Sequence, residues 1–110
     1  MYNYVNLVGV VKNVTEQFIV NEKVIHITLA ISRPFKNMDG KFEVDELDVS
    51  CYGFLGEAIQ ESTKVGTTIG VKGRLQPSNY TTLCKIVAER VYYIGRGEGY
   101  EINADGKEGC

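Results

Sequence analysis

Gly70-Val71-Lys72-Gly73-Arg74-Leu75-Gln76-Pro77-Ser78-Asn79-Tyr80 is the stretch of the chain that bears most directly on its fold. It begins as a short apolar strand with glycine inside it, continues through a basic residue, and ends in a polar turn and an aromatic side chain. Glycine inside a strand marks a sharp bend or a close approach of two backbones. The pattern predicts two strands, at 68–75 and 83–94, that are joined by this turn.

Strand signals dominate the chain upstream of this stretch as well. Residues 5–11 form a near-continuous apolar run, and residues 18–20 and 24–31 flank a polar turn of hairpin length. In the run 24–31 every second residue is aliphatic, which predicts one buried face. That face carries Ile25, Ile27, Leu29 and Ile31. After a polar turn at 37–40, apolar and polar residues alternate over 47–52 and predict a half-buried strand.

A helical pattern occurs at one place, over residues 54–63. Leu55, Ala58 and Ile59 recur there at the spacing of one helix face. Five strands with a helix between the third and the fourth is the order of the OB-fold, a small antiparallel barrel. The sequence therefore predicts an all-β protein, a five-stranded OB-fold β-barrel with one short helix. Another small barrel, such as an SH3-like one, is the alternative, but it usually lacks a helix at this place.

Composition and charge define the domain organisation. Residues 1–94 carry ten Lys or Arg and ten Asp or Glu, so this part is neutral, and the net charge of the whole chain is −2. Charge alone therefore gives no indication of nucleic-acid binding. Residues 95–110 contain five glycines and the excess of acid, which predicts a flexible tail after a single barrel domain at 1–94.

Membrane, secretory and catalytic signals are weak. The apolar runs are far shorter than the roughly 20 residues that span a bilayer, and no secretory signal opens the chain. Cys51 and Cys84 lie within strand patterns and are predicted to be buried, reduced thiols of a cytoplasmic protein. His26 is the only histidine, so no catalytic pair is predicted. We predict no enzymatic activity, no metal site and no cofactor.

Four segments, in their order and spacing, resemble the single-stranded DNA-binding protein family of OB-fold barrels. They are Asn6–Gly9, Thr28–Phe35, Val49–Gly53 and Gly70–Tyr80. The resemblance implies a non-enzymatic protein that binds single-stranded DNA in replication, recombination or repair, in a bacterium or encoded by a phage or plasmid. It also implies a homotetramer or homodimer, with replication or repair proteins as further partners.

The resemblance and the physics of binding together predict the contact residues. Single strands are held by aromatic faces that stack on bases, in a groove lined by Lys and Arg. The predicted stacking residues are Phe35, Tyr52 and Tyr80. The predicted phosphate contacts are Arg33, Lys36, Lys72 and Arg74. The predicted contacts between subunits are Tyr2, Tyr4 and Asn6. Alternatives remain open, since Phe35 could instead cap the core, Tyr52 could lie on a surface or an interface, and Arg74 could pair with Glu89.

Two acidic residues depart from the family pattern. Glu46 stands where the family usually has a stacking aromatic, and Asp48 shares its strand phase with Glu46 and Tyr52. Two carboxylates on the expected DNA face would repel phosphate. The second hypothesis is therefore an OB-fold protein-interaction module, similar to primosomal relatives of the family, that binds DNA weakly or not at all.

Overall fold

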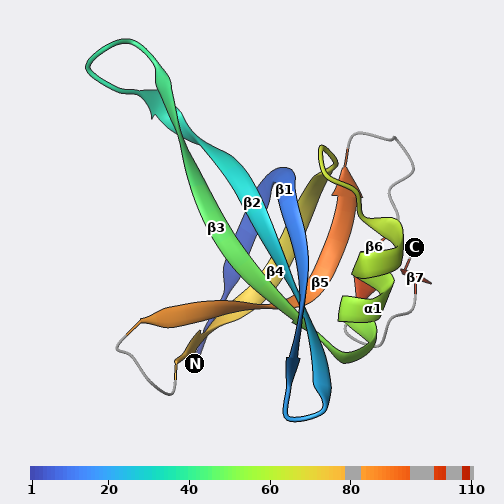
Figure 1. Cartoon of the computed structure of the whole chain (residues 1–110). Helices are drawn as coiled ribbons and strands as arrows, with labels where there is room; N and C mark the ends of the chain where they lie inside the picture. The colour runs from blue at the N-terminus through green and yellow to red at the C-terminus, as the bar shows by residue number, and fades with distance from the viewer. Residues whose placement is uncertain (79–82, 95–100, 104–107, 110) are drawn as a thin grey trace.

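The computed structural model of the chain describes residues 1–78, 83–94, 101–103 and 108–109 (Figure 1). Most of these residues lie in strands. The elements are β1 (Val5–Ile19), β2 (Glu22–Lys36), β3 (Phe42–Tyr52), α1 (Gly53–Ser62), β4 (Thr68–Pro77), β5 (Cys84–Ile94), β6 (Glu101–Asn103) and β7 (Glu108–Gly109). Within the described ranges, no helix is long and apolar enough to span a membrane.

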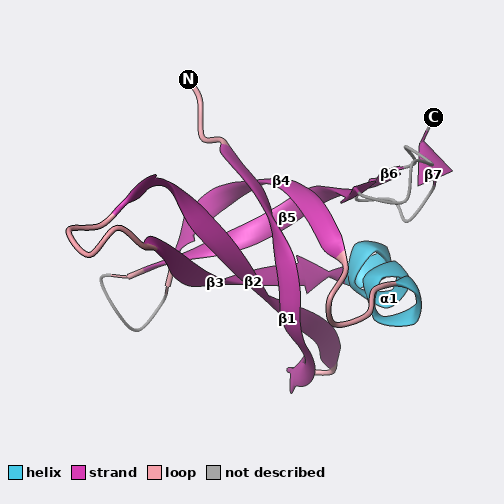
Figure 2. Ribbon diagram, turned by 90° about the horizontal axis from the view of Figure 1, so that it is seen from above, coloured by secondary structure: helices cyan, strands magenta, loops and turns pink. Residues whose placement is uncertain are grey.

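The first five strands close into a barrel. Antiparallel pairing gives the order β3-β2-β1-β4-β5, and a short parallel pairing between β3 and β5 joins the two ends of this sheet. In that pairing Val49 lies opposite Ile86, and Ser50 lies opposite Val87. The helix α1 packs outside the strands, against β2 and β3, at one side of the barrel (Figure 2). The predicted five-stranded OB-fold barrel with a helix between β3 and β4 is confirmed.

The barrel interior is aliphatic, as the alternation in the sequence predicts. Ile25, Ile27 and Leu29 are fully buried, and α1 adds Leu55 and Ile59 to the same core. Ile31 is only partly buried because it lies where β2 leaves the barrel, opposite Asp45. Side chains alternate between the two faces of a strand, and this alternation determines which residues are in the core along the part of the strand that lies within the barrel.

The two cysteines in the barrel strands differ in their environment. Cys51 is buried in the core, as predicted, and burial raises the pKa of its thiol to about 12. Cys84 is exposed, so the prediction that it is buried is wrong. It opens β5 opposite Pro77, beyond the point where β5 meets β3 at Ile86. This end of the β4–β5 hairpin extends past the barrel, and the side chain stays in contact with solvent.

Besides the β4–β5 hairpin, two hairpins project from the barrel (Figure 1). The longer one, which we call the β2–β3 finger, comprises residues 32–45 and carries its turn at 37–41. Asn37 shapes that turn, because its side-chain Oδ1 accepts hydrogen bonds from the backbone N–H groups of Asp39 and Lys41, both at 3.0 Å. The shorter hairpin joins β1 to β2 through Val20 and Asn21, which both have positive φ angles, 47° and 64°.

Part of the segment predicted to be a flexible tail takes up strand structure. The short strand β6 pairs with β5 at Arg90–Tyr92, and β7 pairs with β6. Residues 95–100, 104–107 and 110 lie outside the described residues. A tail separate from the barrel domain therefore stays a prediction, and β6 and β7 are the parts of it that join the sheet.

Candidate nucleic-acid interface

Two adjoining clefts run along one side of the barrel. The first, which we call the face cleft, has a volume of about 480 Å³ and lies between the outer face of β2–β3 and the start of β5. Its lining is His26, Glu46, Leu47, Asp48, Ser50, Cys84, Lys85 and Ile86. The second, the end cleft, has a volume of about 380 Å³ and lies between the β1–β2 turn and the β4–β5 hairpin. Its lining is Ile19, Val20, Glu22, Tyr52, Gln76, Pro77, Ser78 and Lys85.

Lys85 stands at the junction of the two clefts and contacts Tyr52. Its Nζ donates a 2.6 Å hydrogen bond to the Tyr52 hydroxyl and lies 5.1 Å from the centroid of the Tyr52 ring. Tyr52 is half-buried and lines the end cleft, consistent with its strand phase opposite to the buried Cys51. The structure thus combines an aromatic face and a cation, the two groups that single-stranded nucleic acids require.

Sequence reasoning missed Lys85. The residue lies 33 positions from Tyr52 in the chain, and only the closure of β3 against β5 brings the two together. A basic residue at the start of the last strand was the only local signal. Its partner could be identified only from the register of the barrel.

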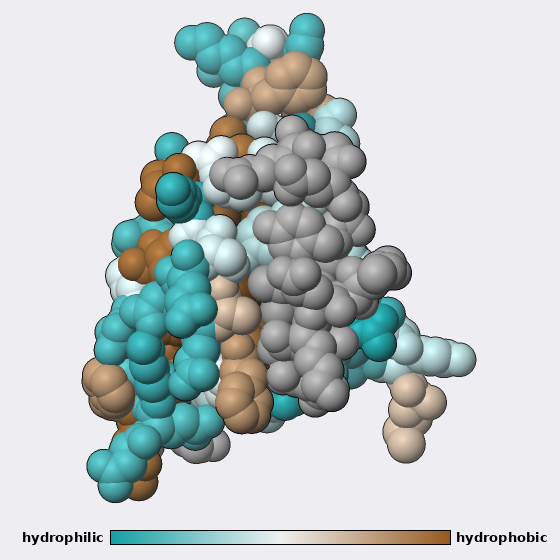
Figure 3. All heavy atoms as spheres, turned by 90° about the vertical axis from the view of Figure 1, so that its right-hand side faces the viewer, coloured by the Kyte–Doolittle hydropathy of each residue, from teal (hydrophilic) through white to brown (hydrophobic). Residues whose placement is uncertain are grey.

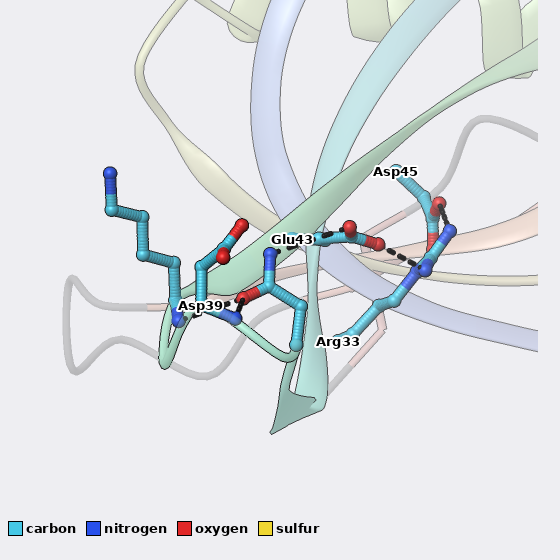
Figure 4. Close-up of polar contacts among 6 residues, drawn as sticks. Arg33, Asp39, Glu43 and Asp45 are labelled. Carbon is cyan, nitrogen blue, oxygen red and sulfur yellow. Dashed lines mark hydrogen bonds and ion pairs between the residues drawn. The ribbon is translucent and has the colours of Figure 1, made fainter.

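Arg33, a predicted phosphate contact, is bound by two carboxylates of the β2–β3 finger (Figure 4). Its Nε and Nη2 donate to the two carboxylate oxygens of Asp45, at 3.1 and 2.9 Å, and its Nη1 donates to Glu43. Hydrogen bonds from Arg33 hold the pKa of Asp45 below its usual range, and Asp45 in turn raises the pKa of Arg33. The guanidinium therefore carries no unbalanced positive charge on this side of the finger.

The aromatic residues of the finger are exposed. Phe35 is 63% exposed, so it does not cap the barrel core, and Phe42 is 54% exposed. Lys36 pairs with Phe42 across the hairpin, and its Nζ lies 5.7 Å from the centroid of that ring. Lys36, a predicted phosphate contact, therefore lies next to the aromatic ring of Phe42, which is not among the predicted site residues.

Lys72 and Arg74 occupy different surroundings on β4. Lys72 Nζ lies 5.2 Å from the ring centroid of Tyr4, so a predicted DNA contact stands beside a predicted subunit contact. Arg74 lies opposite Val87 in the sheet and donates a 2.9 Å hydrogen bond to Gln76, which lines the end cleft. Arg74 thus connects to the end cleft through Gln76, whereas Lys72 belongs with the N-terminal segment.

The residues predicted at a subunit interface lie along the N-terminal segment and the start of β1. Tyr2 and Tyr4 are exposed, with ring centroids 5.8 Å apart. Asn3 fixes this segment to β4 through two hydrogen bonds with the backbone of Leu75. Asn6 lines a cleft of about 190 Å³ on the outer face of β1, β4 and β5. The predicted stacking residue Tyr80 lies outside the described residues.

The outer face of β2–β3 is acidic, as the sequence predicts. Glu46 and Asp48 are exposed and both line the face cleft. Asp48 accepts a 2.7 Å hydrogen bond from the Thr28 hydroxyl on the neighbouring strand. Hydrophobic side chains also reach the surface between hydrophilic ones in the view of Figure 3. Phe18, Ile19 and Val20, in and beside the β1–β2 turn, are among the exposed hydrophobic residues.

Comparison with solved structures agrees with the barrel. The structure of the second single-stranded DNA-binding protein (SSBb) from Mycobacterium smegmatis superposes with a TM-score of 0.65 at 18% identity and covers 86% of this chain and 90% of that one. The small single-stranded DNA-binding protein from Streptomyces coelicolor gives a TM-score of 0.66 at 21% identity, with 88% and 99% covered. At such identities the likeness shows a shared fold.

Comparison of sequences identifies the family. Single-stranded DNA-binding protein B of Bacillus subtilis is 33% identical over 82 residues, which cover 73% of each chain. The single-stranded DNA-binding proteins of Aquifex aeolicus and Streptococcus mutans are 31% and 37% identical, and the matches span 63% and 37% of their lengths. Residues 2–93 match the model of the single-strand binding protein family. The chain therefore belongs to the single-strand binding protein family.

Proposed function

We propose that this protein binds single-stranded DNA, without catalysing a reaction, along a path through the face cleft and the end cleft. The contact between Tyr52 and Lys85 at the junction of the clefts is the observation that carries this proposal. In OB-folds the face of strands 2–3 and the loops between strands 1 and 2 and between strands 4 and 5 bind oligonucleotides. The two clefts occupy these positions.

The finger extends this path on the side away from the end cleft. Phe35 and Phe42 are exposed there, and Lys36 stands beside Phe42. In this proposal the rings of Tyr52 and of the finger stack on bases, while Lys36 and Lys85 contact phosphates. Roles in replication, recombination or repair, and a cytoplasmic location, belong to the same proposal.

Homo-oligomerisation is supported by an apolar face outside the barrel. Val8, Val10 and Ile94 are exposed on β1 and β5, around the cleft that Asn6 lines. Scattered exposed aliphatic residues are normal, but a cluster on one sheet face suits a contact between protein surfaces. We propose that Tyr2, Tyr4 and Asn6 contribute to this contact, which would join the DNA paths of two or four subunits and raise the affinity by linking sites.

Fluorescence anisotropy of labelled oligo(dT), at low and moderate salt, tests the proposal. We expect sub-micromolar binding that weakens as salt rises, because phosphate neutralisation releases counterions. Tyr52→Ala should weaken binding by about fivefold or more, since one stacked base is worth roughly 1–3 kcal/mol. Lys85→Gln should flatten the salt dependence, whereas the matched change Lys64→Gln, at an exposed residue beyond α1, should not. Failure of the unaltered protein to bind at low salt would overturn the proposal.

The second candidate function, a protein-interaction module, is favoured by the charges around the face cleft. Glu46 and Asp48 are exposed there, and the carboxylates of the finger neutralise Arg33. Such a face suits a basic protein surface better than phosphate. Absence of oligo(dT) binding, combined with a stable oligomer by light scattering, would favour this function over DNA binding.

A further inference from the structure

We propose that the end cleft seats one unstacked nucleobase of the bound strand, and that Val20 is held in a strained conformation to form a wall of this seat. The inference rests on the proposed function, because it names a subsite within the DNA path. Its structural basis is the β1–β2 turn and the residues that face it across the cleft.

Val20 has a backbone conformation that a β-branched residue rarely adopts. Its φ angle is 47°, in the left-handed region, where the Cβ atom approaches the following carbonyl oxygen. Turns of two residues with positive φ at both positions prefer Asn and Gly. Asn21 satisfies this preference at the second position, with φ at 64°, whereas Val20 does not at the first.

Burial in the core does not offset this strain. The Val20 residue is 93% exposed, and the neighbouring Ile19 is also exposed. Strained residues of this kind persist where the surrounding structure imposes them, and they cluster at sites that bind ligands. Val20 also lines the end cleft together with Ile19. The strained residue and the cleft therefore coincide.

The chemistry of the end cleft matches that of a base. A base has two apolar faces and a polar edge, and its nucleotide carries a phosphate. Ile19, Val20 and Pro77 supply apolar contacts for the faces, and Tyr52 supplies an aromatic one. Gln76 and Ser78 supply polar groups for the edge. The volume of about 380 Å³ falls in the range of small-molecule sites, which suits one nucleotide.

Lys85 explains why the end cleft would hold a nucleotide that belongs to the bound DNA strand. Because Lys85 lines both clefts, a phosphate beside its ammonium group can join a base in the end cleft to the chain in the face cleft. A base enters such a seat only when it is free of a complementary strand. The seat therefore selects single strands over duplexes.

Val20→Asn tests the inference with a variant that should fold better than the natural sequence. Asparagine suits the turn, so we expect the Tm to rise by on the order of 4 °C. Loss of the apolar wall should weaken oligo(dT) binding by about fivefold or more. Val65→Asn is the matched control, because Val65 is an exposed valine beyond α1, and it should leave binding unchanged. A stabilised variant that binds less tightly excludes misfolding as the cause.

A strand of the same length without bases separates base contacts from backbone contacts. We expect the unaltered protein and Val20→Asn to bind this abasic strand equally well at low salt. A Val20→Asn variant that binds oligo(dT) as tightly as the unaltered protein would overturn the inference and leave the proposed function intact. A lower Tm would overturn it too, because the turn would then not be strained. Failure of the unaltered protein to bind oligo(dT) would instead overturn the proposed function.

Discussion

The pairing of Arg33 with two carboxylates leads to a quantitative prediction about salt. A cation that contacts a phosphate of a single strand contributes about −0.7 to the slope of log K against log salt concentration. Arg33 is bound by Asp45 and Glu43, so the three groups together carry a charge of −1 and the guanidinium is not free for a phosphate. We therefore expect Arg33→Gln to leave the slope of oligo(dT) binding unchanged.

The converse perturbation should release the arginine. In the double variant Glu43→Gln and Asp45→Asn, Arg33 keeps its charge and loses both partners. We expect the slope to steepen by about 0.7, so a fourfold rise in salt should cost the variant about 2.6-fold more affinity than it costs the unaltered protein. At the lowest salt the variant should bind more tightly.

Anisotropy titrations of oligo(dT) at four or more salt concentrations measure these slopes. Lys41→Gln serves as a control, because it removes a charge in the turn of the same finger. A slope that flattens by about 0.7 in Arg33→Gln would refute the reasoning, since it would show that Arg33 exchanges its carboxylates for a phosphate when DNA binds.

Three further predictions concern the folded chain. Arg33 lowers the pKa of Asp45, so this pair stabilises the fold fully above the ordinary pKa of aspartate and loses its contribution as the pH falls through the lowered value. The free energy of unfolding, measured in urea, should therefore fall less at acidic pH in Asp45→Asn than in the unaltered protein. Gly73→Ala would place a Cβ 2.1 Å from the backbone oxygen of Val87 and should lower the free energy of unfolding by roughly 1–3 kcal/mol or more, as urea titration would show. A thiol reagent at about pH 8, used on a variant without the C-terminal cysteine, should modify Cys84 at once and Cys51 only on unfolding, because burial keeps the Cys51 thiol protonated.

The strands and the helix of the barrel were predictable because the patterns that mark them are local, and the resemblance to a known family supplied their arrangement. Alternation along β2 identifies the buried face that carries Ile27, and the spacing of Leu55 and Ile59 identifies the helix face. Local patterns do not determine the exposure of Cys84. Its residue pattern resembles that of a buried strand position, but burial depends on how far β5 runs past β3, and no local pattern records that length.

The site was only partly predictable because its contacts join distant residues. Tyr52 could be recognised from its phase, whereas its partner Lys85 is set by the pairing of β3 with β5. Arg33 was predicted as a phosphate contact from its charge, because a single position in the sequence does not show the carboxylates opposite it. Lys36 was predicted as a phosphate contact, and the hairpin register that places it beside Phe42 is not visible in the local sequence.

The lysines next to aromatic rings differ from Arg33 in one electrostatic respect. A ring attracts a cation without adding an opposite net charge, so the contacts of Lys36 with Phe42 and of Lys85 with Tyr52 do not offset the lysine charge as a carboxylate would. Each of these pairs can therefore offer a stacking surface and a phosphate contact at the same place. On the proposed path these two lysines are the cations beside exposed or half-buried rings.

This arrangement predicts binding that depends mainly on stacking. Two phosphate contacts give a slope of about −1.4 for each protomer bound to oligo(dT), which is shallow for a DNA-binding protein. The carboxylates of Glu46 and Asp48 repel phosphate from the face cleft, so they also make stacking the larger part of the affinity. Removal of the ring at Tyr52 should therefore cost more affinity at moderate salt than removal of the charge at Lys85. A slope steeper than about −3 in the unaltered protein would contradict this reasoning, since it would require phosphate contacts well beyond the two lysines.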